Sequence, residues 1–398
     1  MTHLGELLTD VADQAPRTGM AERALRAARR RRARTLAAAP VAVLLAAGVV
    51  VGGTAALERL TPPGPTGQAE RLGVLNAHVP GPLPARGVAP ARLAYIDYCR
   101  ATAERAAGRA CSEWRVLTSD GMQYRVPHSL GAYRAGTNAD GNVATPSRLA
   151  ALSGDGRRIM YYRADSERVV VRDLAAGTER TVARLPLRTV RTRPVEFVLN
   201  RDGTWAGVET GVVTRSDASP HPSRPMLVNV ASGTVARMPA GRVFDAINPD
   251  GTSYMEAAGA DENSVAKYDT GGRVLERVAD RSGFGPVSPD GKLLADLGVP
   301  WSRMLQTRDI RTGGVHATLT PRGLPTGNYA VQAWPRPATI TIAGRFTAGH
   351  QVDDTKTGRF GFYLIDAGSG RIEGSGTFTI TGRRTQIVYG AITPPGGG

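Results

Sequence analysis

Ser288-Pro289-Asp290-Gly291 is the clearest of four copies of one short motif in this chain of 398 residues. The other copies are Ser153-Gly154-Asp155-Gly156, Asn200-Arg201-Asp202-Gly203 and Asn248-Pro249-Asp250-Gly251. Their aspartates lie 47, 48 and 40 residues apart, and a period of this size indicates one repeated supersecondary unit. Proline presets the first central position of a tight turn, aspartate caps the turn, and glycine accepts a positive φ angle. We therefore interpret Asp155-Gly156, Asp202-Gly203, Asp250-Gly251 and Asp290-Gly291 as turn residues rather than as ligands.

A second turn signal follows each copy of the motif. Examples are Asn229 with Gly233, Asp269 with Gly272, and Asp309 with Gly313. Short runs that alternate or are continuously apolar lie between the turns, such as 158–163 and 293–297, and none is long enough for a helical period. Each unit therefore reads as four short strands, and four-stranded units every 40 to 50 residues are typical of β-propeller blades.

The number of blades follows from where the units begin. Units start near residues 149, 195, 243, 284 and 329, and the last carries Trp334-Pro335-Arg336-Pro337 where Asp-Gly is expected. The segment 93–126 supplies strands for one more blade, and 388–396 resembles the first strand and turn of that blade. The sequence therefore predicts an all-β, six-bladed propeller closed by its C-terminal strand, which leaves the ring without an open edge. Seven blades are the alternative.

The Ser-Pro-Asp-Gly turn, followed by a small apolar strand and then Asp-x-x-Thr/Ser-Gly, resembles the blade signature of TolB-like and WD-repeat-like propellers. The resemblance covers residues 85–396, although the Trp-Asp and Gly-His pairs of true WD repeats are missing. It implies a propeller fold with a binding surface, and the chain as a whole resembles a membrane-anchored protein of this type from a high-GC bacterium. It implies no reaction and no cofactor, because function belongs to sites rather than to folds.

An uncharged stretch of 23 residues, Thr35 to Leu57, follows an arginine-rich run and would span roughly 34 Å as a helix. Residues 20–34 hold seven arginines and residues 58–72 hold two, so the positive-inside rule places the N-terminus in the cytoplasm. The predicted organisation is a cytoplasmic tail (1–34), a transmembrane helix (35–57), a Pro/Gly-rich tether (58–90) and an extracytoplasmic propeller (91–396). A cleaved signal peptide is the competing interpretation.

The chain has two cysteines, Cys99 and Cys111, and both lie outside the membrane under this topology. An oxidising location favours a disulfide between them, worth about 3 kcal/mol for a loop of this length. Two free thiols are the alternative.

The cytoplasmic tail carries an apolar stripe formed by Leu4, Leu7, Leu8 and Val11 at helical spacing. A tail of 34 residues has no core that could bury this stripe, so we expect a partner, preferably a cytoplasmic regulatory protein. The layout resembles that of membrane-bound anti-sigma regulators, although the tail lacks their His-x3-Cys-x2-Cys motif.

Catalytic chemistry leaves no recognisable pattern in this sequence. None of the six histidines has helical metal-ligand spacing, and the acidic pairs Asp261-Glu262 and Asp353-Asp354 fall in polar loops. The formal net charge of +15 favours anionic lipid headgroups or envelope polymers, because nucleic acid is not expected outside the membrane. We therefore expect a non-catalytic platform that binds an extracytoplasmic protein or an anionic envelope polymer. The alternatives are a sensor that signals through the N-terminal helix and an envelope hydrolase or lyase.

Overall fold

The computed structural model describes residues 70–75, 78–96, 113–131, 148–211, 223–257, 265–277, 286–288, 290–297, 304–325, 327–336, 338–346, 358–380 and 387–390. The chain divides into two compact units, Met1–Thr61 and Pro62–Gly398, and every described residue belongs to the second. The predicted tail helix with Leu4, Leu7, Leu8 and Val11, the span 35–57, and Cys99 with Cys111 all lie outside the described residues. No helix within the described ranges combines the length and the apolar character needed to cross a bilayer.

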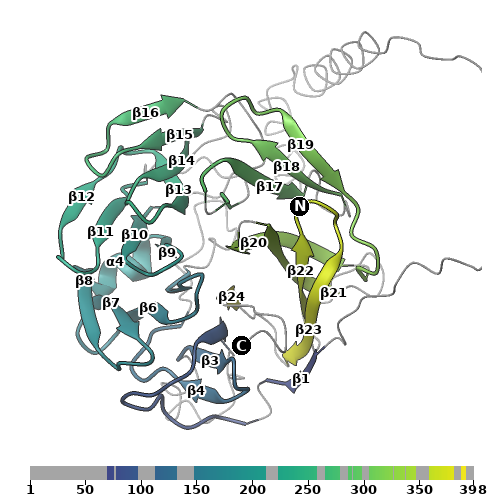
Figure 1. Cartoon of the computed structure of the whole chain (residues 1–398). Coiled ribbons are helices and arrows are strands. Elements are labelled where there is room, and N and C mark those ends of the chain that lie inside the picture. Colours follow the sequence, from purple (N-terminus) through teal and green to yellow (C-terminus); the bar gives the residue numbers. More distant parts are fainter. Residues whose placement is uncertain are drawn as a thin grey trace, which may run out of the picture. The chain divides into compact units, whose positions relative to one another are not determined.

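Six sheets are arranged in a ring, which confirms the prediction of an all-β, six-bladed propeller (Figure 1). From the axis outward, blade 1 contains β24 (Ile387–Tyr389), β2 (Ala91–Tyr95), β3 (Arg115–Thr118) and β4 (Gln123–Arg125). Blade 2 contains β5 (Ala150–Leu152), β6 (Arg158–Arg163), β7 (Arg168–Asp173) and β8 (Glu179–Arg184). Blade 3 contains β9 (Val195–Leu199), β10 (Trp205–Thr210), β11 (Met226–Asn229) and β12 (Val235–Arg237).

The remaining three blades follow in chain order. Blade 4 contains β13 (Arg242–Ile247), β14 (Ser253–Ala257), β15 (Val265–Tyr268) and β16 (Val274–Arg277). Blade 5 contains β17 (Leu293–Leu297), β18 (Leu305–Asp309) and β19 (Val315–Leu319), and a single bridge between Val287 and Leu294 stands at its inner side. Blade 6 contains β20 (Gly327–Arg336), β21 (Thr339–Phe346), β22 (Gly358–Asp366) and β23 (Ile372–Ile380), with β1 (Glu70–Val74) as a fifth strand.

The ring closes as the sequence predicts, through a strand from the end of the chain. β24 pairs antiparallel with β2, with Leu93 opposite Tyr389 and Ala94 opposite Val388. Blade 1 therefore takes its innermost strand from the C-terminal end of the chain and its other three strands from the N-terminal half. This pairing satisfies the inner edge of β2, which would otherwise be open.

The repeated Asp-Gly turns join the first strand to the second in blades 2 to 5, where the single bridge at Val287 stands for the first strand of blade 5. Asp155, Asp202, Asp250 and Asp290 each accept a hydrogen bond through Oδ1 from the backbone N–H two residues later. The glycine that follows each aspartate has φ between +68° and +83°. That conformation is expensive for any residue with a Cβ atom, which explains why glycine recurs at this position.

These turns also connect neighbouring blades. The first or second residue of the following strand reaches across to the same turn of the next blade: Arg158 Nη1 donates to Asp202 O, Trp205 Nε1 to Pro249 O, and Tyr254 OH to Gly291 O. Blade 6 lacks the Asp-Gly pair, and there Trp334 Nε1 donates to Pro286 O of blade 5. The repeated motif therefore sets the register between blades as well as the shape of the turn.

The predicted tether is the main difference from the sequence analysis. Residues 70–75 and 78–90, which we call the strap, pack against the ring instead of forming a free linker. β1 pairs parallel with β23, and Pro82 forms a parallel bridge with Arg125 of blade 1. Further along, Gly87 N donates to Ala175 O of blade 2. The propeller thus already includes Glu70, rather than beginning at residue 91.

Apolar side chains explain why the strap packs. Leu75, Leu83 and Val88 are each at most 6% exposed, and Leu83 and Val88 belong to the core shared by blades 1 and 2. Burying a side chain of this size is worth about 1.5 to 3 kcal/mol, enough to order a segment rich in proline and glycine. The strap therefore fastens blades 6, 1 and 2 across the point where the ring closes.

Candidate functional site

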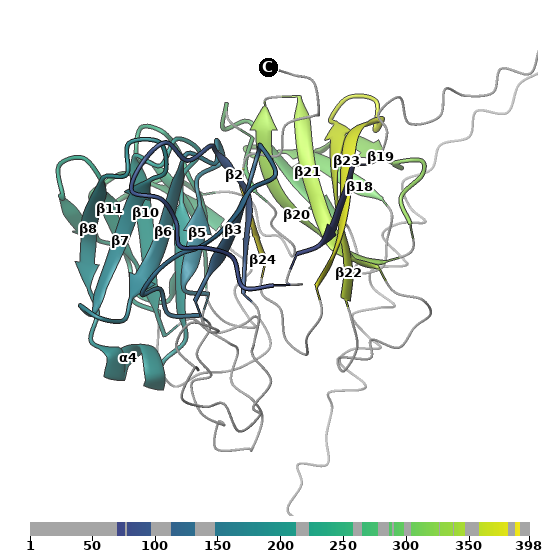
Figure 2. The same ribbon diagram turned by 90° about the horizontal axis from the view of Figure 1, so that it is seen from below.

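The two faces of the ring differ in the connections that they carry. Tight turns join the first strand of a blade to the second and the third to the fourth, and we call their side the turn face. The connections from second to third strand and from blade to blade lie on the opposite side, the loop face. They include α4 (Leu187–Thr192), which Figure 2 shows beyond the lower ends of the strands. Because antiparallel strands alternate in direction, this division follows from topology alone.

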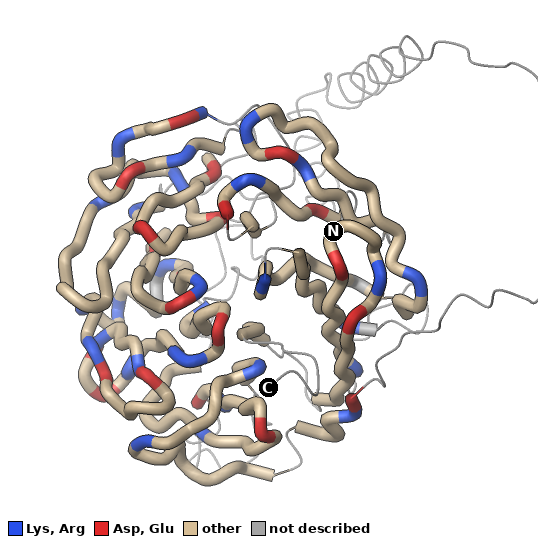
Figure 3. Tube along the Cα trace, viewed as in Figure 1, with Lys and Arg blue, Asp and Glu red and all other residues tan. Residues whose placement is uncertain are grey.

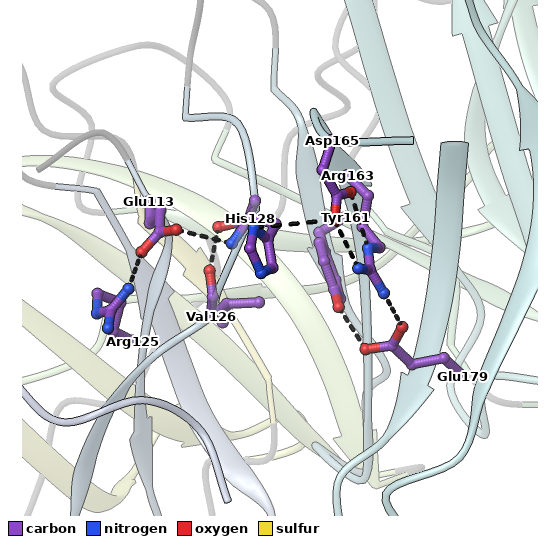
Figure 4. Close-up of polar contacts among 9 residues, drawn as sticks. Glu113, Arg125, Val126, His128, Tyr161, Arg163, Asp165 and Glu179 are labelled. Carbon is purple, nitrogen blue, oxygen red and sulfur yellow. Dashed lines mark hydrogen bonds and ion pairs between the residues drawn. The ribbon is translucent and has the colours of Figure 1, made fainter. Parts of the chain in front are cut away.

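A network of charged and polar side chains lies at the junction of blades 1 and 2 (Figure 4). Glu113, two residues before β3, is 8% exposed and accepts from Arg125 Nη1 at 2.6 Å and from the backbone N–H of His128 at 2.7 Å. His128 has a φ of +61°. Its Nδ1 atom lies 3.8 Å from Asp165 Oδ2, in the turn between β6 and β7. Glu113 therefore holds the segment that brings His128 to blade 2.

Blade 2 continues this network toward its outer strand. Arg163 donates through Nε and Nη2 to the two carboxylate oxygens of Asp165, and through Nη1 to Glu179 Oε2 at 2.8 Å. Glu179 Oε1 accepts from Tyr161 OH at 2.7 Å (Figure 4). Arg163 thus joins two carboxylates in one fork geometry, which is the arrangement that a guanidinium group favours.

Both ends of this network contact the strap. Arg172 donates to Glu179 at 3.4 Å and to the backbone carbonyl of Ala85 at 3.2 Å. On the other side, Leu83 N donates to Arg125 O at 2.7 Å. The contacts therefore form a closed circuit through the strap, blade 1 and blade 2.

Three groups on the blade 2 side of the circuit, Tyr161, Asp165 and Glu179, have pKa values shifted away from neutrality. Burial, with the hydrogen bond to Glu179, raises the pKa of Tyr161, so the phenol stays protonated. Although burial opposes it, hydrogen bonds from Tyr161 and Arg163 lower the pKa of Glu179, and Arg163 lowers that of Asp165. Acid–base catalysis needs a pKa near the working pH. Tyr161, Asp165 and Glu179 are therefore better suited to fastening the strands than to transferring protons.

A second group of carboxylates lies on the inner strands of blades 3 and 4. Glu209 of β10 is 1% exposed, and its carboxylate accepts a hydrogen bond from the backbone N–H of Phe244 in β13. Glu196 of β9 stands directly opposite Glu209, and the register of β13 shifts at Asp245. Burial raises the pKa of Glu209 well above its usual range, and Glu196 and Asp245 add to the effect. Glu209 therefore favours the protonated form.

The turn residues singled out in the sequence lie on the turn face, each in its own blade, and do not come together in one site. The residues of the circuit were missed because their contacts join segments of two different blades. Glu209 did leave a signal, since it is a carboxylate within the apolar strand Trp205–Thr210. Across the described ranges, no three His, Cys, Asp or Glu side chains are grouped in a way that could hold a metal ion.

No protein-family model matches this sequence, and no curated protein matches it. Among solved structures, an oligogalacturonate lyase in complex with manganese is similar, with a TM-score of 0.38 and 15% identity over 65% of this chain and 69% of that one. Oligogalacturonate lyase from Vibrio parahaemolyticus has a TM-score of 0.38 and 12% identity, over 65% of this chain and 70% of its own. A protein of unknown function from Bacteroides caccae has a TM-score of 0.41 and 12% identity, over 74% of this chain and 100% of its own. Similarity at this level concerns the fold and carries no conclusion about activity.

Proposed function

We propose that this protein is a non-catalytic binding platform, a six-bladed propeller displayed outside the cytoplasm on the membrane span Thr35–Leu57. Its loop face would bind an extracytoplasmic protein or an anionic envelope polymer. The proposal combines the ring seen in the structure with the charge pattern around residues 35–57 in the sequence.

The difference between the two faces is the observation that carries this proposal. On the turn face, hydrogen bonds from Arg158, Trp205 and Tyr254 occupy the turns of neighbouring blades, so this face is engaged in holding the ring together. On the loop face, the connections differ in length and sequence from blade to blade, as 164–167 and 211–225 illustrate. Scaffolds of this kind place their binding residues on variable loops carried by rigid strands.

Rigidity at the blade 1–blade 2 junction supports the same proposal. A scaffold that binds with little conformational cost needs its strands held in fixed positions. The closed circuit supplies such constraints, because Glu113, Arg163 and Glu179 each engage at least two partners. Tyr161 and Glu179 do not titrate near neutral pH, so the constraint holds across ordinary conditions.

Photo-cross-linking in native membranes tests this proposal. A photoreactive residue replaces Arg188 in α4 or Met304 at the start of β18, both exposed at the loop face. Matched controls carry it at Lys292 or Arg201, both exposed at the turn face. We expect one discrete adduct, protein or polysaccharide, from the loop-face positions alone. Adducts of equal yield from both faces would contradict the proposal.

A sensor that signals to the cytoplasm is the second candidate, and the apolar stripe Leu4, Leu7, Leu8 and Val11 is the observation that favours it. Under this proposal, Leu7→Asp abolishes a cytoplasmic interaction while the thermal stability of the propeller stays unchanged. A cross-linking capture that compares the intact protein with one lacking residues 1–16 measures this directly. An identical set of partners for both forms would exclude signalling through the tail.

A further inference from the structure

The outer rim of the ring is unevenly covered. β1 pairs with the outermost strand of blade 6, and Pro82 bridges to the outermost strand of blade 1. The outermost strands of blades 2 to 5 are β8, β12, β16 and β19, and no further described strand pairs with them. Four sheet edges are thus open within the part of the chain that the structure describes.

Open edges are normally guarded against pairing by bulges, by charged side chains or by short length. Bulges or similar irregularities interrupt the pairing of β8, β16 and β19 with their neighbours. The pairing of β12 with β11 has no such shift: Met226, Leu227 and Val228 stand opposite Arg237, Ala236 and Val235 in regular order. β12 has three residues and is the open edge that keeps an undistorted ladder, which its flanking backbone hydrogen bonds extend beyond the strand.

The backbone of β12 is oriented for pairing with another strand. Asn229 N donates to Thr234 O at 2.9 Å and Met238 N donates to Pro225 O at 3.0 Å, so the ladder extends from Thr234 to Met238. Hydrogen-bonded and non-hydrogen-bonded pairs alternate along an antiparallel ladder. The backbone groups of Val235 and the N–H of Arg237 consequently point away from β11, toward the outside of the ring, while the Arg237 carbonyl oxygen lies beside Gly272 of blade 4.

Aliphatic side chains are exposed beside this edge. Val235 is 50% exposed, and on the neighbouring outer strand β16 Val274 is 47% and Leu275 53% exposed. The two blades abut here, since a Cβ atom added to Gly272 of blade 4 would lie 3.3 Å from Arg237 O. Exposed aliphatic side chains therefore lie on the outer strands of two blades that abut.

Arginines flank the same edge. Arg180 of β8 donates to Ala231 O at 2.9 Å, which fixes its guanidinium beside the turn that precedes β12. Arg237 and Arg277 end their strands with exposed side chains, and neither forms an ion pair with any described residue. In Figure 3, basic positions recur along the outer rim on the side of β8, β12 and β16. We define the rim patch as Arg180, Val235, Arg237, Val274, Leu275 and Arg277.

We propose that the rim patch binds an extended, acidic and apolar segment of a partner protein, which adds to β12 as a further strand. The ring already contains one such addition, because β1 lies along β23 with Glu70 opposite Gly376 and Arg71 opposite Thr377. Strand addition gains main-chain hydrogen bonds along an open edge and takes its specificity from the side chains beside it. The rim patch is a second surface beyond the proposed loop-face function, and it does not depend on that function.

The chemistry of the patch favours a polypeptide over a carbohydrate polyanion. Arginines alone would suit either partner, since both carry negative charge. Exposed Val235, Val274 and Leu275 offer apolar contact that a charged sugar chain does not use. The outward backbone groups of β12 can form a ladder only with another peptide backbone.

Fluorescence anisotropy of the full-length protein in nanodiscs tests the proposal with defined probes. The first probe is a short peptide of alternating Glu and Val residues. The second is the same peptide N-methylated at every other residue, which keeps the charge but blocks strand pairing. The third is polyphosphate. We expect saturable binding of the first peptide, at least about tenfold weaker binding of the methylated peptide, and protection of the Val235 and Arg237 amides from hydrogen exchange.

Charge reversal supplies the matched variants. Arg237→Glu together with Arg277→Glu is expected to weaken binding of the first peptide about tenfold, whereas Arg322→Glu, exposed on the connection between blades 5 and 6, leaves it unchanged. Equal affinity for both peptides would contradict strand addition and indicate simple anion binding. The same conclusion would follow if the double variant lost affinity for polyphosphate and for the first peptide to the same extent. No binding of any probe would overturn the rim patch, while adducts from Arg188 or Met304 would leave the loop-face proposal standing.

Discussion

Gly177 is the position at which the seating of the strap can be tested most sharply. It lies in the turn between β7 and β8 with a φ of +73°, and a Cβ atom added there would lie 1.6 Å from the carbonyl oxygen of Ala85 in the strap. Gly233 occupies the same turn position in blade 3 with the same φ of +73°, and no atom lies within 4 Å of its added Cβ. Gly177→Ala and Gly233→Ala therefore share the backbone strain and differ in the clash with the strap.

The magnitudes follow from these two contributions. A positive φ costs an alanine about 1 to 2 kcal/mol, and both variants carry that cost. Gly177→Ala must also displace the Ala85 carbonyl, and overpacking of this kind costs about 1 to 3 kcal/mol more. Complete release of the strap is the more expensive outcome, because burial of Leu83 and Val88 would be lost. We expect Gly177→Ala to lose about 1 to 3 kcal/mol beyond Gly233→Ala.

Two readouts measure this difference. Thermal unfolding of the full-length protein should place the Tm of Gly177→Ala a few degrees below that of Gly233→Ala, at about 2 to 4 °C per kcal/mol. Hydrogen exchange at Gly87 and Val88, whose amides donate to blade 2, should accelerate in Gly177→Ala alone. Equal Tm values together with unchanged exchange at these two amides would show that the strap does not rest on Gly177.

Three further predictions address the core, the ring closure and the cysteines. Glu209→Gln should raise the Tm at pH 7 and leave it unchanged near pH 4. The folded pKa of Glu209 lies above the unfolded value of 4.5, so its contribution to stability is lost as pH rises from 4.5 through the folded pKa, whereas glutamine stays neutral and still accepts the Phe244 N–H. A Tm difference independent of pH would contradict this prediction. Deletion of residues 387–398 removes β24 and should lower the Tm strongly and promote aggregation. Deletion of 391–398 leaves β24 in place and should have little effect. Equal Tm values for the two truncations would show that β24 does not close the ring. If Cys99 and Cys111 are bonded, a reductant should destabilise the protein by about 3 kcal/mol and have no effect on the Cys99→Ser, Cys111→Ser double variant, while an unchanged Tm in both would indicate free thiols.

The sequence predicted the ring well because its signals are local. Each Asp-Gly turn is confined to a few residues, and the hydrogen bonds of Asp202 and Asp250 to residues two positions later need no distant partner. The closing strand was also predictable, since blade 1 lacked one strand and 388–396 offered one without neighbours. Repetition made both inferences possible, because a missing strand can be recognised only when the other blades show how many strands a blade contains.

The strap and the circuit depend on contacts that sequence spacing does not show. Leu72, Leu75, Leu83 and Val88 lie among prolines and glycines, so composition suggested a free tether, and the strand that pairs with β1 is about 300 residues away. Glu113 contacts His128, and His128 contacts Asp165, across two blades whose relative placement is a property of the folded ring. Burial of Leu83 and Val88 against blades 1 and 2 outweighed the local preference of the segment.

The location of the propeller relative to the membrane is the point on which the proposed platform depends most. It is measured by fusing alkaline phosphatase, which is active only outside the cytoplasm, or green fluorescent protein, which fluoresces after folding inside it, to Gly398 of the full-length chain. We predict an active phosphatase fusion and a dark fluorescent-protein fusion, both recovered in the membrane fraction. An inactive phosphatase fusion with a bright fluorescent-protein fusion would place the propeller in the cytoplasm and contradict the account.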